Sequence, residues 1–204
     1  MLFHGPQGPF FFLFFAAIMS MPHVILTKDS FLNSALSELL QEVPPNRKVC
    51  FVDIESYRSL SVIYRRLTRK NLTLSHRLIF IGGKDVSSKV LEPLVTVYRK
   101  SSLMEFRRQL IHGRTNRLEY AVNHIARCRS LVMLTAQEKR TLIALLETDD
   151  TNAAARRIYL SQKTVYTYTR SIGMKLNLSS ILQVRQFIFS EFTEDAENKE
   201  SITY

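Results

Sequence analysis

One polar stretch, residues 161–176, carries side chains that are suited to bind a large anion with a patterned surface. Lys163, Arg170 and Lys175 supply positive charge, Tyr166 supplies an aromatic edge, and no Asp or Glu interrupts the stretch. Cationic side chains of this kind contact DNA phosphates, and residues near the start of a helix reach base edges in the major groove. The chemistry indicated is recognition of double-stranded DNA.

The same stretch is predicted to form a helix. Ser161 is a good N-cap, because its hydroxyl can accept a hydrogen bond from the backbone N–H groups of the first turn. Val165, Tyr168 and Ile172 recur at helical spacing and are expected to face inward. The cationic and aromatic side chains then occupy the outer face.

Residues 151–160 are expected to form a partner helix, which a tight turn joins to the helix at residues 161–176. Ala155 sits where two steeply crossing helices need a small side chain. This is the pattern of a helix-turn-helix, whose first helix crosses the DNA backbone while the second enters the major groove. Two ordinary amphipathic helices of a small bundle share the spacing, so the pattern alone leaves that alternative open. The expected shared core consists of Ala154, Ile158, Leu160 and Val165.

The flanking sequence resembles the C-terminal domain of the LuxR/NarL family of bacterial transcription regulators over roughly residues 131–190. Residues 134–138, LTAQE, look like the family's opening LT-x-x-E and also form a capping box. Residues 160–165, LSQKTV, are similar to its L-S-x-x-T-V, and Lys175-Leu176 to its closing K-L. The sequence departs from the family at Asp149-Asp150, in place of a glycine turn, and at Tyr168, where histidine is common.

The resemblance implies DNA-binding roles for seven residues. Those expected to face the bases are Lys163, Val165, Tyr166 and Arg170, with Val165 sharing its side chain between the core and a thymine methyl group. Those expected to face the DNA backbone are Thr164, Tyr168 and Lys175.

Charge is distributed unevenly along the 204 residues. The formal net charge of +10 and a pI of about 9.8 favour an anionic partner. Residues 56–129 hold sixteen Lys or Arg against four Asp or Glu, and residues 161–185 hold four against none. Residues 191–204 reverse the sign, with five acidic residues and one Lys. Much of the basic charge is therefore expected on solvated helix faces of the N-terminal half.

Neither the cysteines nor the histidines have the spacing of metal ligands. Cys50 and Cys128 lie far apart, which fits a reduced, cytoplasmic protein, and the five histidines are scattered. We expect no metal, no cofactor and no enzymatic activity.

Residues 1–20 contain an apolar, Phe-rich run at 10–18 that is too short to span a bilayer as a helix. No Lys or Arg precedes it, which argues against a signal peptide. We expect translation to start at Met19 or Met21, so that this run is not in the working protein.

Residues 21–113 alternate between strand and helix patterns, which predicts an α/β domain with a mostly parallel sheet. Strands are expected at residues 23–27, 48–53, 77–81 and 95–98.

This half resembles, more faintly, the receiver domain of response regulators. Asp53 ends a strand where a receiver has its phospho-accepting aspartate, and Lys100 follows the last strand where a receiver has its phosphate-contacting lysine. Thr27-Lys28 replaces the acidic pair that holds Mg²⁺, and Gly82-Gly83 replaces a Ser or Thr. Only about seven residues separate the first helix from the strand at 48–53, so one βα unit is missing or much shortened.

Phosphoryl transfer to an aspartate needs a divalent cation with oxygen ligands to neutralise the charge on the phosphate. Lys28 would repel that cation. We therefore expect a degenerate receiver in which Asp53 and Lys100 are at most a vestigial phosphoacceptor site.

The remaining segments complete the expected organisation. Residues 114–130 are expected to be a linker helix that begins with a capping box at 116–119. Residues 131–192 are expected to be an all-α, four-helix domain of the LuxR type. Its final helix, capped by Ser179 or Ser180, is the dimer contact of that family or else the lid of a monomeric core. Residues 193–204 are expected to be an acidic, disordered tail.

The sequence thus predicts a cytoplasmic, nucleoid-associated transcription regulator that binds double-stranded DNA as a homodimer, or as a heterodimer with another regulator, without membrane contact. By analogy alone, its expected targets are fimbrial or other surface-structure genes. Two alternatives remain: a phosphorylatable two-component response regulator, and an interaction protein that modulates another regulator.

Overall fold

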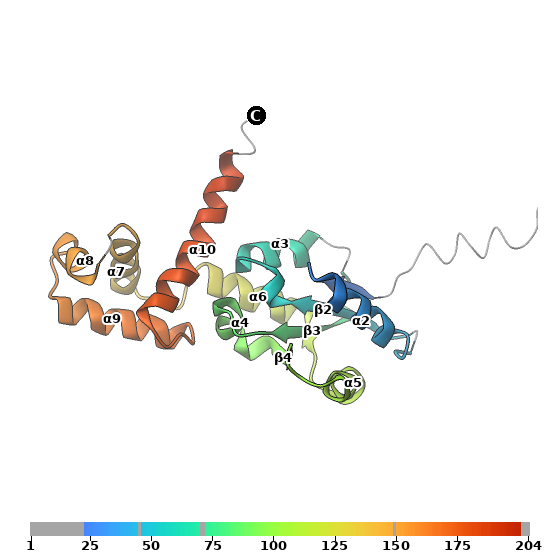
Figure 1. Cartoon of the computed structure of the whole chain (residues 1–204). Helices are drawn as coiled ribbons and strands as arrows, with labels where there is room; N and C mark the ends of the chain where they lie inside the picture. The colour runs from blue at the N-terminus through green and yellow to red at the C-terminus, as the bar shows by residue number, and fades with distance from the viewer. Residues whose placement is uncertain (1–22, 45, 70–71, 149, 201–204) are drawn as a thin grey trace, which may run out of the picture.

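A computed structural model describes residues 23–44, 46–69, 72–148 and 150–200, the last eight of these through their backbone alone. The described chain forms an α/β unit, a connecting helix and a helical unit (Figure 1). The Phe-rich run and the expected translation start lie outside the described residues.

The α/β unit is built on parallel strands in the order β1-β2-β3-β4. A short strand, β5, pairs antiparallel with the beginning of β3. The central strand β2 has five consecutive buried residues, as expected for a parallel strand that is covered on both faces. The predicted, mostly parallel sheet is confirmed. The strands are β1 (Val24–Leu26), β2 (Lys48–Asp53), β3 (His76–Gly82), β4 (Val95–Tyr98) and β5 (Asn116–Arg117).

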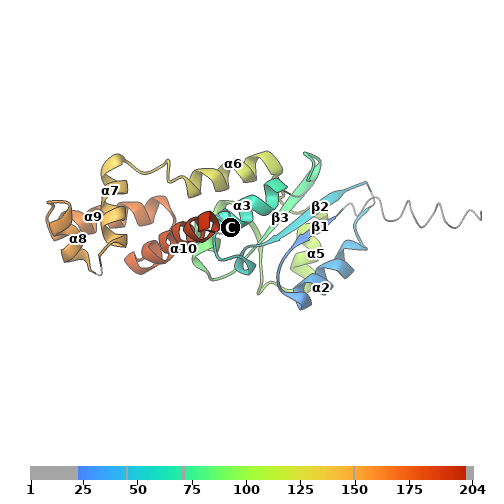
Figure 2. The same cartoon turned by 90° about the horizontal axis from the view of Figure 1, so that it is seen from above.

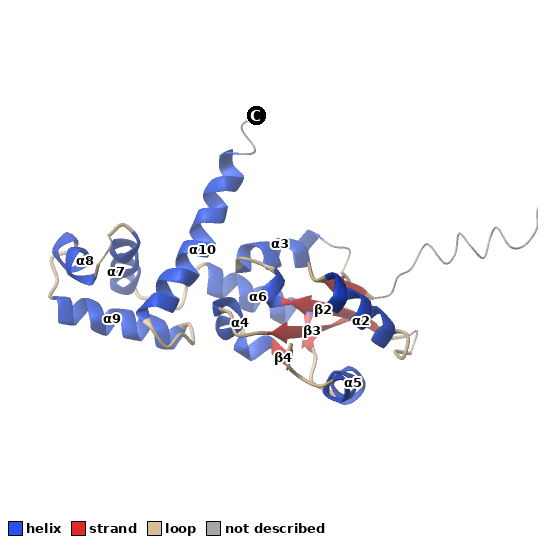
Figure 3. Ribbon diagram, in the orientation of Figure 1, coloured by secondary structure: helices blue, strands red, loops and turns tan. Residues whose placement is uncertain are grey.

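Helices cover both faces of this sheet (Figure 3). Side chains alternate across a strand, so Phe51 packs with α2 and α5 on one face while Val52 packs with α3 and α6 on the other. Helix α2 joins β1 directly to the neighbouring strand β2 through the short connection that the sequence predicts. The helices are α2 (Ser30–Leu40), α3 (Leu60–Arg69), α4 (Val86–Val90), α5 (Leu103–His112) and α6 (Leu118–Arg129), with 3-10 turns η1 (Ile54–Ser56) and η2 (Glu92–Leu94).

The start of α6 differs from the predicted capping box. Asn116 lies in β5 instead, where it is buried and its side-chain amide donates to the Leu94 carbonyl at 2.7 Å. Arg117 occupies the N-cap position without a side-chain hydrogen bond. The tertiary partner offered by Leu94 outweighs the local capping pattern.

The helical unit contains α7 (Ala136–Leu146), α8 (Thr151–Arg157), α9 (Gln162–Lys175) and α10 (Ile181–Glu200). The four predicted helices are confirmed. Helix α10 continues through residues 193–200, where we expected disorder. The segment is rich in Glu and contains Ala and Lys, all good helix formers, which accounts for the continuation.

The two units share one hydrophobic core. Ile172 of α9 and Phe187 of α10 belong to the same buried cluster as Leu60 of α3 and Phe80 of β3. Helix α10 contacts both α3 and α4. The predicted two-part organisation is therefore joined by a packed junction, not only by a linker.

Helices α7 and α9 are tied together through Glu138, whose side chain is buried. One carboxylate oxygen accepts from the backbone N–H of Thr135 and pairs with the Lys175 ammonium group, both at 2.7 Å. The other accepts from the Ser171 hydroxyl. Burial by itself would raise the pKa of Glu138, but these partners outweigh it and lower the pKa to about 2.

We predict that Gly173→Ala destabilises the fold by about 1–3 kcal/mol, because overpacking forces the backbone to shift. A Cβ atom at Gly173 would lie 2.7 Å from the carbonyl oxygen of Leu178, in the turn between α9 and α10. Urea denaturation measures the loss. Met174→Ala, at an exposed neighbouring position, is the control. If Gly173→Ala is as stable as the native protein, the turn at Leu178 is not held close to α9.

We also predict an acid-sensitive contribution from Glu138. A carboxyl whose pKa falls from 4.5 to about 2 on folding stabilises the protein above pH 4.5, and the contribution disappears as the pH falls toward 2. Across that window the native protein should lose on the order of 3 kcal/mol more than Glu138→Gln. Urea denaturation at several pH values tests this, with the exposed Glu147→Gln as control. If the free energy of unfolding of the native protein and of Glu138→Gln depends on pH in the same way, Glu138 does not have the lowered pKa assigned to it.

Candidate nucleic-acid interface

The predicted helix-turn-helix is present in α8 and α9. The Ser161 hydroxyl accepts from the Thr164 backbone N–H at 3.1 Å and so caps α9. Ala154 and Ala155 are buried at the crossing and, with Ile158, surround Val165 in a small core. The turn is closed by the Leu160 N–H, which donates to the Ala155 carbonyl at 3.0 Å. The small alanines let the helices approach closely enough to fix the direction of α9.

The outer face of α9 presents the side chains that the sequence singled out. Lys163 and Arg170 are exposed, and the Tyr166 side chain keeps 63% of its surface exposed. These residues stand three, four and seven positions apart, so they share one side of the helix. Thr164 and Tyr168 are half-buried beside them. The result is a cationic, aromatic face without a carboxylate in α9 itself.

The inward face of α9 differs from the prediction at one position. Thr169, not Tyr168, is buried with Val165, Ile172 and Gly173. The Thr169 hydroxyl donates to the Val165 carbonyl at 2.8 Å, which satisfies it inside the core. Sequence reasoning missed this because it counted Thr as polar and Tyr as a core former.

Val165 and Lys175 stand apart from the other predicted DNA-binding residues. Val165 is fully buried in the core between α8 and α9, so in this conformation its side chain does not reach a thymine methyl group. The Lys175 ammonium group is held by Glu138 at the contact with α7. Each therefore supports the helix that carries the exposed residues.

Tyr159 is an exposed residue close before α9 in the chain that the sequence did not single out. It lies in the turn before α9, adopts a left-handed backbone conformation with φ of 57°, and leaves 90% of its surface exposed. A bulky residue rarely adopts this conformation. The one feature of the sequence that could have indicated this conformation is the absence of a glycine from the turn between α8 and α9.

The second predicted site surrounds Asp53 at the end of β2. Asp53 is buried, and Arg99 donates to both of its oxygens, from Nε at 3.0 Å and from a terminal nitrogen at 2.6 Å. The hydroxyl of Thr27 donates to the carboxylate at 2.7 Å, and that of Ser56 also contacts it.

Arg99 occupies this site as a built-in cation. Its guanidinium also lies 3.5 Å from Asp29 and 3.3 Å from Glu55, and the hydrogen bonds to Asp53 raise the pKa of Arg99. Lys100, the residue expected beside Asp53, is exposed instead. The planar guanidinium can bond both oxygens of one carboxylate, which an ammonium group cannot do with the same geometry. Sequence reasoning looked for a lysine and missed the arginine beside it.

The Lys28 side chain is exposed, with its ammonium group 5.8 Å from the ring centre of Tyr57. In the part of the chain that the structure describes, no group of three or more His, Cys, Asp or Glu residues has the arrangement of a metal site. Among the same residues, none of the helices has the length and apolar character to cross a membrane.

Comparisons with known proteins give matches to solved structures alone. No protein-family model and no curated protein sequence matches the chain. Among solved structures, RcsB from Salmonella enterica serovar Typhimurium, bound to the rprA promoter in the presence of the phosphomimetic BeF3−, is similar. Its identity is 13% and its TM-score 0.56, over 82% of this chain and 98% of that chain.

Two further structures match to the same extent. The two-component response regulator RcsB in a DNA complex is 14% identical, with a TM-score of 0.55 over 82% of this chain and 97% of that chain. RcsB from the same Salmonella serovar, bound to the P1flhDC promoter, is 14% identical, with a TM-score of 0.56 and the same coverage. At this identity the likeness concerns the fold: this chain has the two-part fold of these RcsB structures.

Proposed function

We propose that this chain is a DNA-binding transcription regulator that reads double-stranded DNA with α9. The observation that carries the proposal is the exposed face formed by Lys163, Tyr166 and Arg170 on the second helix of a helix-turn-helix. The fold likeness to RcsB, which was solved bound to DNA, supports it. So does the resemblance of residues 131–190 to the LuxR/NarL family.

The residues of α9 divide the work of binding. Lys163, Tyr166 and Arg170 face the base edges, whereas Thr164 and Tyr168 lie at the margin, where they contact phosphates. Val165 holds the helix in place from the buried core, and Lys175 holds it through the ion pair with Glu138.

The regulator acts without phosphorylation of Asp53. Arg99 already neutralises the carboxylate that would accept a phosphoryl group, and its guanidinium fills the space in front of both oxygens. A divalent cation would have to displace this side chain. The phosphorylatable response regulator is therefore the less favoured alternative.

The regulator works as a dimer through the outer face of α10. Leu182 and Phe192 leave 70% and 51% of their surfaces exposed, and Phe189 is also exposed between them. Exposed apolar side chains grouped on one helix are typical of an interaction surface. We propose a second copy of the chain, or another regulator with the same helix, as the partner. The protein would act in the bacterial cytoplasm, at the nucleoid, and by analogy alone on fimbrial genes.

We predict that Lys163→Ala and Tyr166→Ala each weaken binding to the operator by about 1–3 kcal/mol, with a much smaller effect on random DNA. Mapping of bound DNA in cells supplies the operator, and titration against operator and scrambled duplexes at several salt concentrations measures the effect. Lys100→Ala, on the exposed surface of the α/β unit, is the control.

Circular dichroism establishes that each α9 variant is folded. If both variants bind the operator like the native protein, α9 is not the reader. The alternative of an interaction protein that modulates another regulator then takes precedence, and a pull-down with candidate regulators becomes the relevant assay.

We also predict that a small-molecule phosphodonor with Mg²⁺ leaves the native chain unphosphorylated at Asp53. Intact-mass spectrometry detects the phosphoryl group, and operator binding should be unchanged by the donor. A phosphorylated response regulator serves as positive control. If the native chain gains one phosphoryl group and Asp53→Asn gains none, Asp53 is a phosphoacceptor and the proposed independence from phosphorylation is wrong.

A further inference from the structure

A hollow of about 280 Å³ lies at the junction of the two units, lined by residues of α4, of α6 and of the end of α9. Helix α6 leads from the α/β unit toward the helical unit (Figure 2). The Asn177 side chain ties the end of α9 to α4, because it donates to the Lys89 carbonyl at 2.8 Å. The lining includes an imidazole, a thiol and two thioethers, which belong to His124, Cys128, Met133 and Met174.

Two of these donors already have the separation of two ligands on one metal ion. His124 and Cys128 stand four positions apart in α6, so their side chains share one face of the helix. The Cys128 Sγ atom lies 3.7 Å from the His124 Nε2 atom. With the bond lengths of zinc sites, about 2.3 Å to sulfur and about 2.0 Å to nitrogen, two ligands lie about 3.5 Å apart at the tetrahedral angle and about 3.7 Å apart at the trigonal angle. One ion can therefore contact both atoms without a change in α6.

The exposure of the four donors gives an ion a way in. Cys128 is buried, His124 and Met133 are half-buried, and Met174 is exposed. The hollow thus runs from a buried thiol to a thioether in contact with solvent.

Two charged residues also line the hollow, but each is engaged elsewhere. The Lys175 ammonium group is paired with Glu138, and the Glu92 carboxylate accepts from the Tyr98 hydroxyl. The uncharged sulfur and nitrogen atoms are therefore the donors that the hollow offers to a metal ion.

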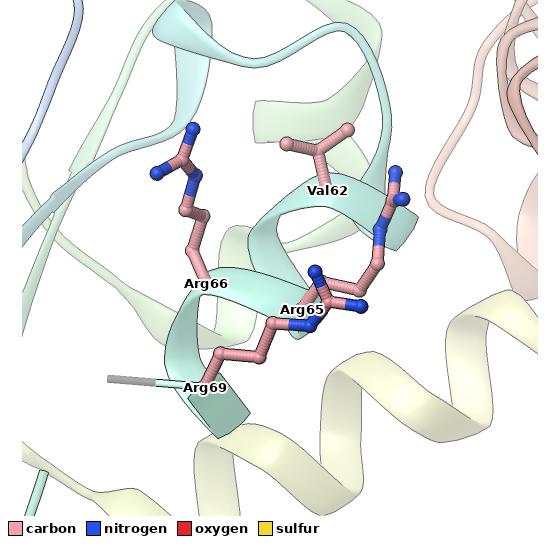
Figure 4. A pocket seen from close by; sticks show the side chains of 4 residues that line it. All are labelled: Val62, Arg65, Arg66 and Arg69. Atoms are coloured by element: carbon pink, nitrogen blue, oxygen red, sulfur yellow. The ribbon is translucent and has the colours of Figure 1, made fainter. Parts of the chain in front are cut away.

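This donor set favours a soft metal ion. Thiolate and thioether sulfur select Cu(I), whereas zinc sites use Cys, His and carboxylate ligands. The hollow on α3 is of the opposite kind: Val62, Arg65, Arg66 and Arg69 line it (Figure 4), and guanidinium groups are cations that donate hydrogen bonds and repel a metal ion. Spacing along the sequence did not indicate the junction group, because its donors come from three segments and two of them are methionines.

We propose that His124, Cys128, Met133 and Met174 form a binding site for Cu(I). Coordination forms a copper–sulfur bond at Cys128 and breaks its S–H bond, and the proton passes to water. The other three donors bind through lone pairs without losing a proton. Burial raises the pKa of the Cys128 thiol to about 11, so only an ion with a strong preference for sulfur displaces this proton near neutral pH. The bound ion joins α6 to the end of α9.

Titration of the full-length chain with Cu(I), under anaerobic and reducing conditions, tests the site. A chromophoric chelator of known affinity competes for the ion, so its absorbance reports the dissociation constant. Met133→Leu combined with Met174→Leu removes both thioethers at nearly constant volume, and His124→Gln removes the imidazole. Met104→Leu and His112→Gln change the same residue types at exposed positions of α5 and are the matched controls.

The native chain should bind a Cu(I) ion that each site variant holds at least about tenfold more weakly, because even the hydrogen-bond partners of metal ligands contribute about that much. The controls should bind Cu(I) like the native chain. X-ray absorption of the copper-loaded native chain should show more than one sulfur neighbour, and fewer in the methionine double variant. Equal Cu(I) affinity of the native chain and the site variants would overturn the site.

Two further measurements make the test independent of folding and of the choice of metal. Cys128→Ala should also lose Cu(I) affinity, with circular dichroism as the check on its fold; if it does not fold, the methionine double variant decides the question. Zn²⁺ added in equal amount should leave the copper bound, and displacement of copper by Zn²⁺ would show that the site is not selective for a soft ion. Neither measurement depends on whether α9 reads DNA.

Discussion

The relation between the two halves of the chain depends on the buried carboxylate of Glu191. A buried charge is costly unless hydrogen bonds and an opposite charge compensate it. Here the first turn of α3 supplies the donors and Arg129 the charge, although burial still raises the pKa of Glu191. The same carboxylate satisfies N–H groups that a helix start leaves without partners. This contact thus compensates the buried charge on α10, satisfies the free N–H groups at the start of α3, and fixes where α10 lies.

The position of α10 is transmitted through the core to α9, the proposed DNA-reading helix. Ile188 and Val184 of α10 are buried in the same cluster as Ile172 of α9, and Gly173 lets the turn at Leu178 approach closely. Because packed cores resist continuous deformation, a shift of the α/β unit would be felt at α9. The proposed regulator is better described as one mechanical body than as a reader with a detachable N-terminal domain.

Local patterns were sufficient to predict most elements of this fold. Short apolar runs predicted β2 and β4 to the residue, and the hydroxyls of Thr135 and Ser161 predicted two helix starts. Three features could not be predicted from local patterns, because each depends on a partner far away in the sequence. Asn116 is drawn into the sheet by Leu94, Arg99 reaches Asp53 from another strand end, and Glu191 finds α3 across 130 residues. Such partners leave no periodic signal in the sequence.

The pairing of Arg99 with Asp53 has a consequence for how such a protein is controlled. A metal ion and a phosphoryl group come and go, so a site that uses them reports a concentration or the activity of another enzyme. A guanidinium that belongs to the chain cannot diffuse away, and its local abundance never changes. Under the proposed function, a site closed in this manner does not respond to phosphorylation. The amounts of the protein and of its dimer partner, set by synthesis and degradation, are then what the cell adjusts.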